Sequence, residues 1–307
     1  MASLIKGNGM IKMGKTSNET ILGMRRILIT LMFTFLPIIA SAQGAGGHII
    51  RPTKKQEQKP AKRVDKTRKQ TMSEAERERI LNNLINNMVY VEGGTFMMGS
   101  SVDDDMWTRG KPRHEVILSS FKICKFEVTQ EEWQAIMGEN PSFHKGKKYP
   151  VECVTWNNCI DFIHRLNDIT GNHFRLPTEA EWEFAARGGN KSSGYYYAGG
   201  NDSDSVMWHY SNSGRHSHVV GTKRPNELGL FDMCGNVGEW VEDWYVKRYI
   251  VDVTMNPKGP NNGMQKVIRG GSFYGGDVIG GVSERIPQIP HHEDMWIGLR
   301  LVQDITK

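Results

Sequence analysis

The stretch GLFDMCGNVGEWVEDW, residues 229–244, combines four acidic side chains with three glycines and several aromatic residues. Such a mixture is unusual for a regular helix or strand, because glycine permits tight turns while aromatic side chains anchor a segment in a core. Asp232 and Glu239 flank the turn expected at 235–236, and backbone carbonyls lie between them. Carboxylate and carbonyl oxygens are the ligands of a hard cation such as calcium. The alternative is a buried turn in which Glu239 caps nearby amides.

The four cysteines, Cys124, Cys153, Cys159 and Cys234, permit two disulfides in an oxidising compartment, with three possible connectivities. Cys153 and Cys159 flank the start of an expected helix and could pair. Free cysteines packed in a core are an equal alternative. No local motif supports a catalytic pair of cysteine and histidine. The disulfide pairing stays open.

Histidines offer a second set of candidate ligands. His216 and His218 would point to the same side of a strand, and residues 291–294 read His-His-Glu-Asp. Two imidazoles and a carboxylate are the ligands of many non-haem iron sites. The favoured alternative is that these histidines lie on surface loops.

Four helices are indicated by their capping residues. Three begin after a threonine N-cap and stop beside a glycine, which is the usual asymmetry of helix ends. They are expected at 130–137, 156–169 and 179–187. A further amphipathic helix at 73–87 begins with a capping box, since Ser73 precedes a glutamate by three residues.

Short strands are expected in four further segments. Their positions are 88–99, where two strands flank a Gly-Gly pair, 114–123, 267–269 and 298–302. Most of the chain after residue 190 is expected to be loop. The sequence therefore predicts an α+β fold that is rich in loops, with short antiparallel sheets and a few helices.

Residues 1–42 have the features of a leader with a signal peptide. Two arginines at 25–26 precede an apolar h-region at 27–39, and an A-x-A cleavage site follows at 40–42. The apolar run is short for a membrane span, although an uncleaved anchor is the alternative. We expect an exported protein, periplasmic, on the outer surface or secreted, whose first mature residue is Gln43.

Charge is distributed unevenly along the chain. Residues 1–50 carry five basic and one acidic side chain, and residues 51–70 carry nine basic and two acidic ones. The whole chain has a net charge of +5, so residues 71–307 carry a net charge of −6. We expect 43–72 to be a basic, disordered linker. A nucleic-acid-binding face is not expected on the acidic remainder, and contact with a membrane is expected only through the leader or the linker.

Six phrases in this order resemble the sulfatase-modifying factor family, whose best-known member is the formylglycine-generating enzyme. They are VYVEGGTFMMGS (89–100), EVTQEEWQAIMG (127–138), RLPTEAEWEFAARGG (175–189), NELGLFDMCGNVGEW (226–240), RGGSF (269–273) and GLRLV (298–302). The resemblance covers about 88–303 and implies a domain at 88–305 with a C-type-lectin-like fold.

The resemblance also bears on the acidic stretch. In the family, a structural calcium ion is held by the residues that match Asp232, Gly235, Val237 and Glu239. The glycine and valine contribute backbone carbonyls, so all ligands are oxygens, as calcium prefers. One departure is Gly238, where the family usually has tryptophan. A second family calcium site has a partial match at Asn212 and Ser213 but lacks a clear downstream aspartate.

The family's reaction depends on residues that this chain lacks. The formylglycine-generating enzyme oxidises a cysteine in a C-x-P-x-R peptide with copper(I) held by two cysteines, because copper(I) prefers thiolates. The corresponding positions here are Gly275 and Gly280, and neither Tyr274 nor Asp277 can replace a thiolate. We therefore expect no copper, no catalytic residue and no formylglycine-generating activity.

Three function classes follow. We favour a non-catalytic binding or scaffold module of the cell envelope that is stabilised by calcium and binds a protein or glycan, with ligand contacts at 273–297. The alternatives are an oxidase with another metal site, acting on a sulfatase-type cysteine peptide, and a helper that binds sulfatases without modifying them. A fold does not decide among these classes. The ligand and the oligomeric state are not encoded in any motif found here.

Overall fold

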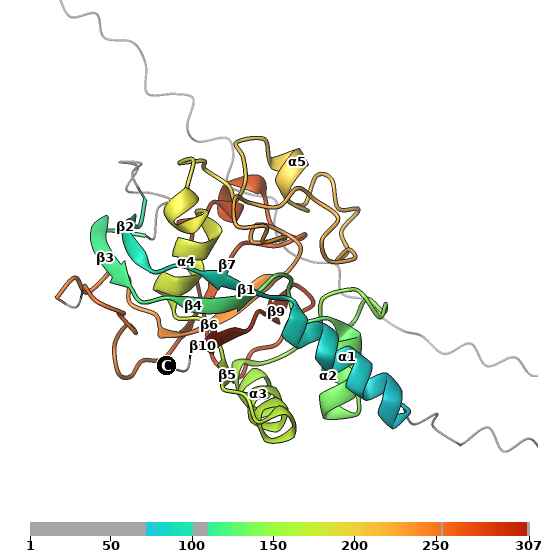
Figure 1. Cartoon of the computed structure of the whole chain (residues 1–307). Helices are drawn as coiled ribbons and strands as arrows, with labels where there is room; N and C mark the ends of the chain where they lie inside the picture. The colour runs from blue at the N-terminus through green and yellow to red at the C-terminus, as the bar shows by residue number, and fades with distance from the viewer. Residues whose placement is uncertain (1–71, 101–109, 253, 306–307) are drawn as a thin grey trace, which may run out of the picture. The chain divides into compact units, whose positions relative to one another are not determined.

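The structure is a computed structural model that describes residues 72–100, 110–252 and 254–305 (Figure 1). The expected leader at 1–42, and all but the last residue of the linker at 43–72, lie outside the described residues. Within the described ranges, no helix is long and apolar enough to cross a membrane.

The first sheet joins the two ends of the described domain. Its strand order is β1-β4-β10-β5, and every pairing is antiparallel. The strands are β1 (Met88–Val91), β4 (Phe121–Cys124), β10 (Val302–Asp304) and β5 (Phe174–Arg175). The expected strand at 114–123 is two strands, because β3 (His114–Leu118) leaves this sheet and pairs with β2 (Gly94–Met98).

The second sheet carries the acidic stretch and the carboxyl-terminal motifs. Its order is β8-β7-β6-β9. The strands are β6 (Gly238–Trp244), β7 (Lys266–Arg269), β8 (Ile286–Gln288) and β9 (Ile297–Leu299). Half of the stretch 229–244 is thus a strand, contrary to the loop expected from its glycines. The sheets are short and antiparallel as expected, except that the β6–β9 pair is parallel.

The helices begin and end close to the expected residues. They are α1 (Glu74–Asn86), α2 (Gln130–Met137), α3 (Trp156–Thr170), α4 (Glu179–Ala186) and the short α5 (Ser203–Val206), with 3-10 turns at Gly189–Lys191 and Asp277–Gly280. Full capping boxes form at Thr129, Thr155 and Thr178. At α1 the Ser73 hydroxyl accepts from the amide of Glu76, whereas the Glu76 carboxylate pairs with Lys147 instead of closing the box.

Two apolar clusters fill the interior. One surrounds α4 and Trp182, and the other lies between α1, α2, α3 and the second sheet around Trp240. Both tryptophans are fully buried. In Figure 1, α1 and α2 lie side by side below the sheets, and α4 lies beside β2 and β7.

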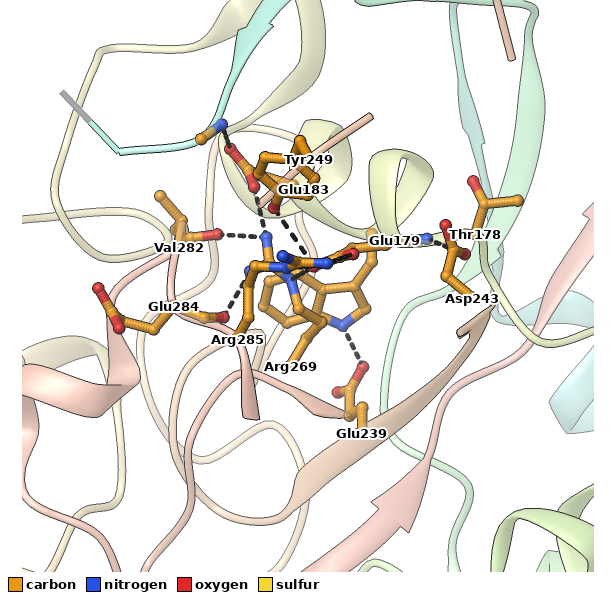
Figure 2. Close-up of polar contacts among 12 residues, drawn as sticks. Thr178, Glu179, Glu183, Glu239, Asp243, Tyr249, Arg269, Val282, Glu284 and Arg285 are labelled. Carbon is orange, nitrogen blue, oxygen red and sulfur yellow. Dashed lines mark hydrogen bonds and ion pairs between the residues drawn. The ribbon is translucent and has the colours of Figure 1, made fainter. Parts of the chain in front are cut away.

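Buried ion pairs tie α4 to the carboxyl-terminal strands (Figure 2). Arg269, from the RGGS phrase, donates to Glu183 at 2.5 Å, and neither side chain is exposed. Arg285 donates to both oxygens of Glu179, at 2.5 and 2.7 Å. Bidentate pairs of this kind combine charge with fixed geometry. They hold the helix against residues about one hundred positions later in the chain.

A third buried arginine neutralises a carboxylate on β6. Arg300, in the GLRL phrase, donates to Glu239 through Nε at 3.0 Å and Nη2 at 2.7 Å. The Trp182 indole donates to the same carboxylate at 2.6 Å. One carboxylate therefore links the second sheet, α4 and the last motif.

Replacing Arg300 with leucine should be strongly destabilising, because it leaves buried carboxylates without a counter-charge. The expected loss in the free energy of unfolding is about 3–5 kcal/mol, the usual result of removing one partner of a buried pair. Lys147→Leu is the matched control, since its pair with Glu76 is exposed, and should cost at most about 1 kcal/mol. Urea unfolding of both variants measures this, and equal losses would contradict the role given to Arg300.

Candidate functional site

The positions of the family's copper ligands are filled by apolar side chains. Gly275 and Gly280 lie on the loop after the RGGS phrase, which includes the 3-10 turn at 277–280. A Cβ atom added at Gly280 would lie 2.9 Å from Sδ of the buried Met207 and closer still to its methyl group. A Cβ at Gly275 would lie 2.9 Å from Cγ1 of Ile279 and closer to Cδ1. The residues present therefore do not fit a copper(I) ion, because glycine supplies no thiolate and the ends of the Met207 and Ile279 side chains would have to move to admit one.

The chain's own cysteines do not supply thiolates elsewhere. All four are free, so the possible Cys153–Cys159 disulfide does not form. Burial raises the pKa of Cys124, Cys153 and Cys234 to about 12, with smaller contributions from nearby carboxylates. Burial also raises the pKa of Cys159. These groups remain neutral thiols at physiological pH. Cys124, Cys159 and Cys234 pack within the core, whereas Cys153 is partly exposed.

An aromatic face surrounds the altered loop. We define it by its exposed large side chains: Phe143, Tyr196, Tyr210, Tyr274, Val278 and Ile279. The backbone of Tyr210 donates to the Gly275 carbonyl at 2.9 Å, and its ring lies 6.3 Å from that of Tyr274. The Tyr196 hydroxyl donates to the Val278 carbonyl at 3.0 Å. The His144 ring, next to that of Phe143, lies 5.4 Å from the Phe273 ring. The face is thus assembled from three segments that each contact residues 273–278.

The segment that contains Phe143 also lies beside histidines. The His144 ring lies next to Phe143 and 6.0 Å from His216, whose ring is 4.4 Å from that of His218. Two imidazole nitrogens are already used, by backbone carbonyls of Ser217 and Ser213, each at 2.8 Å.

His218 stacks on Trp208 with ring centroids 3.7 Å apart. Burial lowers the pKa of His218, and the positive charges of His216 and Lys223 lower it further. In the described ranges, no three side chains of histidine, cysteine, aspartate or glutamate are placed to hold a metal. The alternative iron site, including 291–294, is therefore not assembled there, and these histidines lie in loops as favoured.

The fold brings the predicted calcium residues together, but the oxygens of Asp232 and Glu239 differ in how many hydrogen bonds they already accept. Asp232, Gly235 and Asn236 all have positive φ angles, which produces the tight turn. Asp232 is buried, and its Oδ2 accepts from the Gly221 amide at 2.6 Å. Its Oδ1 is buried and has no hydrogen-bond partner among the described residues. The oxygens of Glu239, by contrast, are already used by an arginine and a tryptophan.

Sequence reasoning missed Glu127. Its carboxylate accepts from the Val237 amide at 3.0 Å and from the Asn236 side chain at 2.7 Å. Burial raises its pKa, and the charges of Asp232 and Glu239 raise it further. The available signal was an acidic residue between two apolar ones in the phrase FEV, directly before the helix cap.

Three buried carboxylates, those of Glu127, Asp232 and Glu239, thus lie near a single arginine, Arg300. Burial raises the pKa of Asp232 to about 6, and the charge of Glu239 adds to the rise. Excess negative charge and the open Asp232 oxygen suit a cation, whereas the engagement of Glu239 does not. The calcium site fits in part and stays a prediction. At the second site, Asn212 donates to the upstream Asp204 at 2.9 Å.

Calcium should stabilise the protein if the loop binds it. At 100 times its Kd, a ligand of the native state adds about 2.7 kcal/mol, which raises Tm by roughly 5–10 °C for a domain of this size. Asp232→Asn should remove this response, and Asp252→Asn, at an exposed position, should keep it. Thermal melts of chelator-treated protein with and without calcium provide the measurement. A calcium-independent melt of the wild type would contradict the prediction.

Residues 72–305 match the family model described as sulfatase-modifying factor enzyme 1-like domain. The chain belongs to this family. It is 33% identical over 237 residues to the chaperone protein LppX of Paenibacillus barcinonensis, covering 61% of this chain and 78% of that protein. It is 34% identical to the formylglycine-generating enzyme of Mus musculus over 155 residues, 46% of this chain and 40% of the enzyme. The chain therefore spans less than half the length of this enzyme.

Solved structures of this kind confirm the fold. Treponema denticola variable protein 1 superposes with a TM-score of 0.64 at 30% identity, covering 71% of this chain and 95% of that one. PvdO from Pseudomonas aeruginosa gives 0.62 at 25% identity, covering 71% and 94%. The loop-rich α+β fold expected from the sequence is thus confirmed for this member of the sulfatase-modifying factor family.

Restoring a copper site in this chain should need space as well as thiolates. Gly275→Cys with Gly280→Cys should bind copper(I) weakly and lose stability, because Met207 and Ile279 occupy the side-chain positions. Adding Met207→Ala and Ile279→Ala should raise the affinity, measured by competition with a copper(I) chelator. Equal affinities of the two-site and four-site variants would contradict the steric argument.

Proposed function

We propose that this chain is an exported binding module of the cell envelope without formylglycine-generating activity. The observation that carries the proposal is the replacement of the copper ligands by glycine, with Met207 and Ile279 in the vacated space. The buried thiols offer no alternative site for the same ion. The scaffold of the family's oxidising enzyme is retained, but glycines stand at its copper-ligand positions and neighbouring apolar side chains lie in the space beside them.

We further propose that the aromatic face is the ligand-binding surface, and that its ligand is a polypeptide. Phe143 is 70% exposed and Tyr274 is 52% exposed. A cluster of exposed aromatic side chains is typical of interaction sites, because these side chains bury large areas with little loss of entropy. Arg215 lies 5.0 Å from the Tyr210 ring and adds a charged group at the edge. Tyrosine and arginine are, with tryptophan, the residue types enriched at binding hot spots.

The relatives support a binding role. One is named a chaperone protein, and one structural neighbour is named a variable protein. Both names suit a family fold that presents different surfaces on a constant scaffold. A glycan ligand would instead use aromatic stacking on the same face, so binding of a polypeptide and of a sugar are distinguished by the ligand recovered.

The test is site-specific crosslinking in the organism's own cell envelope. A photoreactive amino acid at Tyr274 should yield a protein adduct, and one at Tyr90, an exposed position on β1, should not. Excess wild-type domain should compete for the adduct. Excess Tyr210→Ala/Tyr274→Ala domain should compete at least tenfold less well, since the loss of two hot-spot side chains costs more than about 1.4 kcal/mol. Equal adducts at both positions, or equal competition, would contradict the proposal.

A further inference from the structure

A separate cavity of about 270 Å³ lies at the start of α4. It is bounded by α4, the end of β6 and the loop segment 256–261. None of the residues that define the aromatic face lines it. Trp244 and Tyr249 give the wall an aromatic part, Asp243 and Glu179 give it an acidic part, and Lys258 and Arg285 give it a basic part.

Most polar groups on the wall already have partners. The Glu179 carboxylate accepts from Arg285 twice and from the Tyr249 hydroxyl at 3.3 Å. His114 Nδ1 lies 2.9 Å from the Pro112 carbonyl. These groups are held by the protein and have little capacity left for a ligand.

Asp243 differs from them. Its side chain is buried, and Oδ2 accepts from the Glu179 amide at 2.8 Å, as Figure 2 shows. Within the part of the chain that the structure describes, no hydrogen bond reaches Oδ1. Gly259, with φ of 68°, approaches this oxygen so closely that an added Cβ would lie 2.9 Å from it. Asp243 Oδ1 is thus a hydrogen-bond acceptor on the cavity wall that has no donor among the described residues.

The charges around Asp243 favour a cationic donor. Burial raises the pKa of Asp243 to about 8, and the charges of Glu179 and Glu242 raise it further, against the opposing effect of Arg285. Lys266 is nearby, but its ammonium lies 3.9 Å from the Trp244 ring centroid and donates to the Glu242 carbonyl at 2.6 Å. A cation that reaches Oδ1 would stabilise the ionised carboxylate.

We propose that this cavity binds an ammonium group on a short alkyl chain, with Asp243 as its anionic partner. The cavity is slightly smaller than most ligand pockets, which suits a group the size of a lysine side chain. Trp244 and Tyr249 line the cavity and contact the alkyl chain. Their ring faces already hold Lys266 and Arg285, at 3.9 and 4.0 Å, so the attraction for the ammonium comes from Asp243. The ammonium comes either from a free small amine or from a lysine of a partner protein.

Calorimetry on the mature chain tests this with two probes. Butylamine represents the free amine, and a short peptide with one lysine represents a partner. Each has a neutral counterpart, butanol and the same peptide with norleucine. Both cationic probes should bind, and each neutral counterpart should bind at least tenfold more weakly. A peptide at least tenfold tighter than butylamine identifies a partner side chain, and comparable affinities identify a free amine.

Asp243→Asn should weaken both cationic probes at least tenfold, because the amide keeps the acceptor for Glu179 but carries no charge. Asp252→Asn, at an exposed position outside the cavity wall, should leave affinity unchanged. A thermal melt confirms that each variant is folded. Equal binding of butanol and butylamine, unchanged affinity in Asp243→Asn, or no binding of either cation at millimolar concentration would overturn the proposal.

Proton release provides an independent readout. Asp243 is mostly protonated at pH 7, so binding of a cation at pH 7 should release close to one proton. Repeating the titration in buffers of different ionisation heat measures this number, and affinity should rise from pH 6 to pH 8. Release that persists in Asp243→Asn would assign the proton to another group and contradict the proposal. The outcome is independent of crosslinking at Tyr274.

Discussion

The fold depends on buried carboxylates that are matched by three arginines from the carboxyl-terminal part of the chain. Arg269, Arg285 and Arg300 are all buried and pair with glutamates of α4 and β6. Such pairs contribute little net stability compared with apolar packing, but a single unmatched charge is costly. A misplaced helix or strand would leave several of these charges buried without a partner, which is the costly case.

This constraint explains how a family scaffold can persist while its chemistry changes. The ion pairs lie beneath α4 and β6, whereas Gly275 and Gly280 lie on a loop. Replacing ligand side chains in that loop leaves every buried pair intact. Apolar groups then fill the space, and the exposed tyrosines around the loop become the dominant chemistry of that surface. A binding function is what such a surface supports best.

Local signals could be predicted from the sequence, and long-range pairings could not. The helices after Thr129, Thr155 and Thr178 were predictable because caps and terminal glycines act within a few residues. The strand β6 was missed because its glycine-rich start resembles a turn, and its parallel partner β9 lies about sixty residues away. Glu127 was missed for the same reason, since its partners at 236–237 come together only in the fold. Of the calcium residues, Asp232 and Glu239 were predicted from their chemistry and Gly235 and Val237 from the resemblance, and all four await measurement.

The central claim is that the scaffold is kept while the reaction is lost. Mass spectrometry of a C-x-P-x-R peptide, incubated with the purified protein, oxygen and copper(I), tests it most directly when an active family member is run in parallel. The account predicts that the peptide cysteine stays unmodified and that the protein retains no copper after desalting. Formation of formylglycine in repeated turnovers would contradict the account.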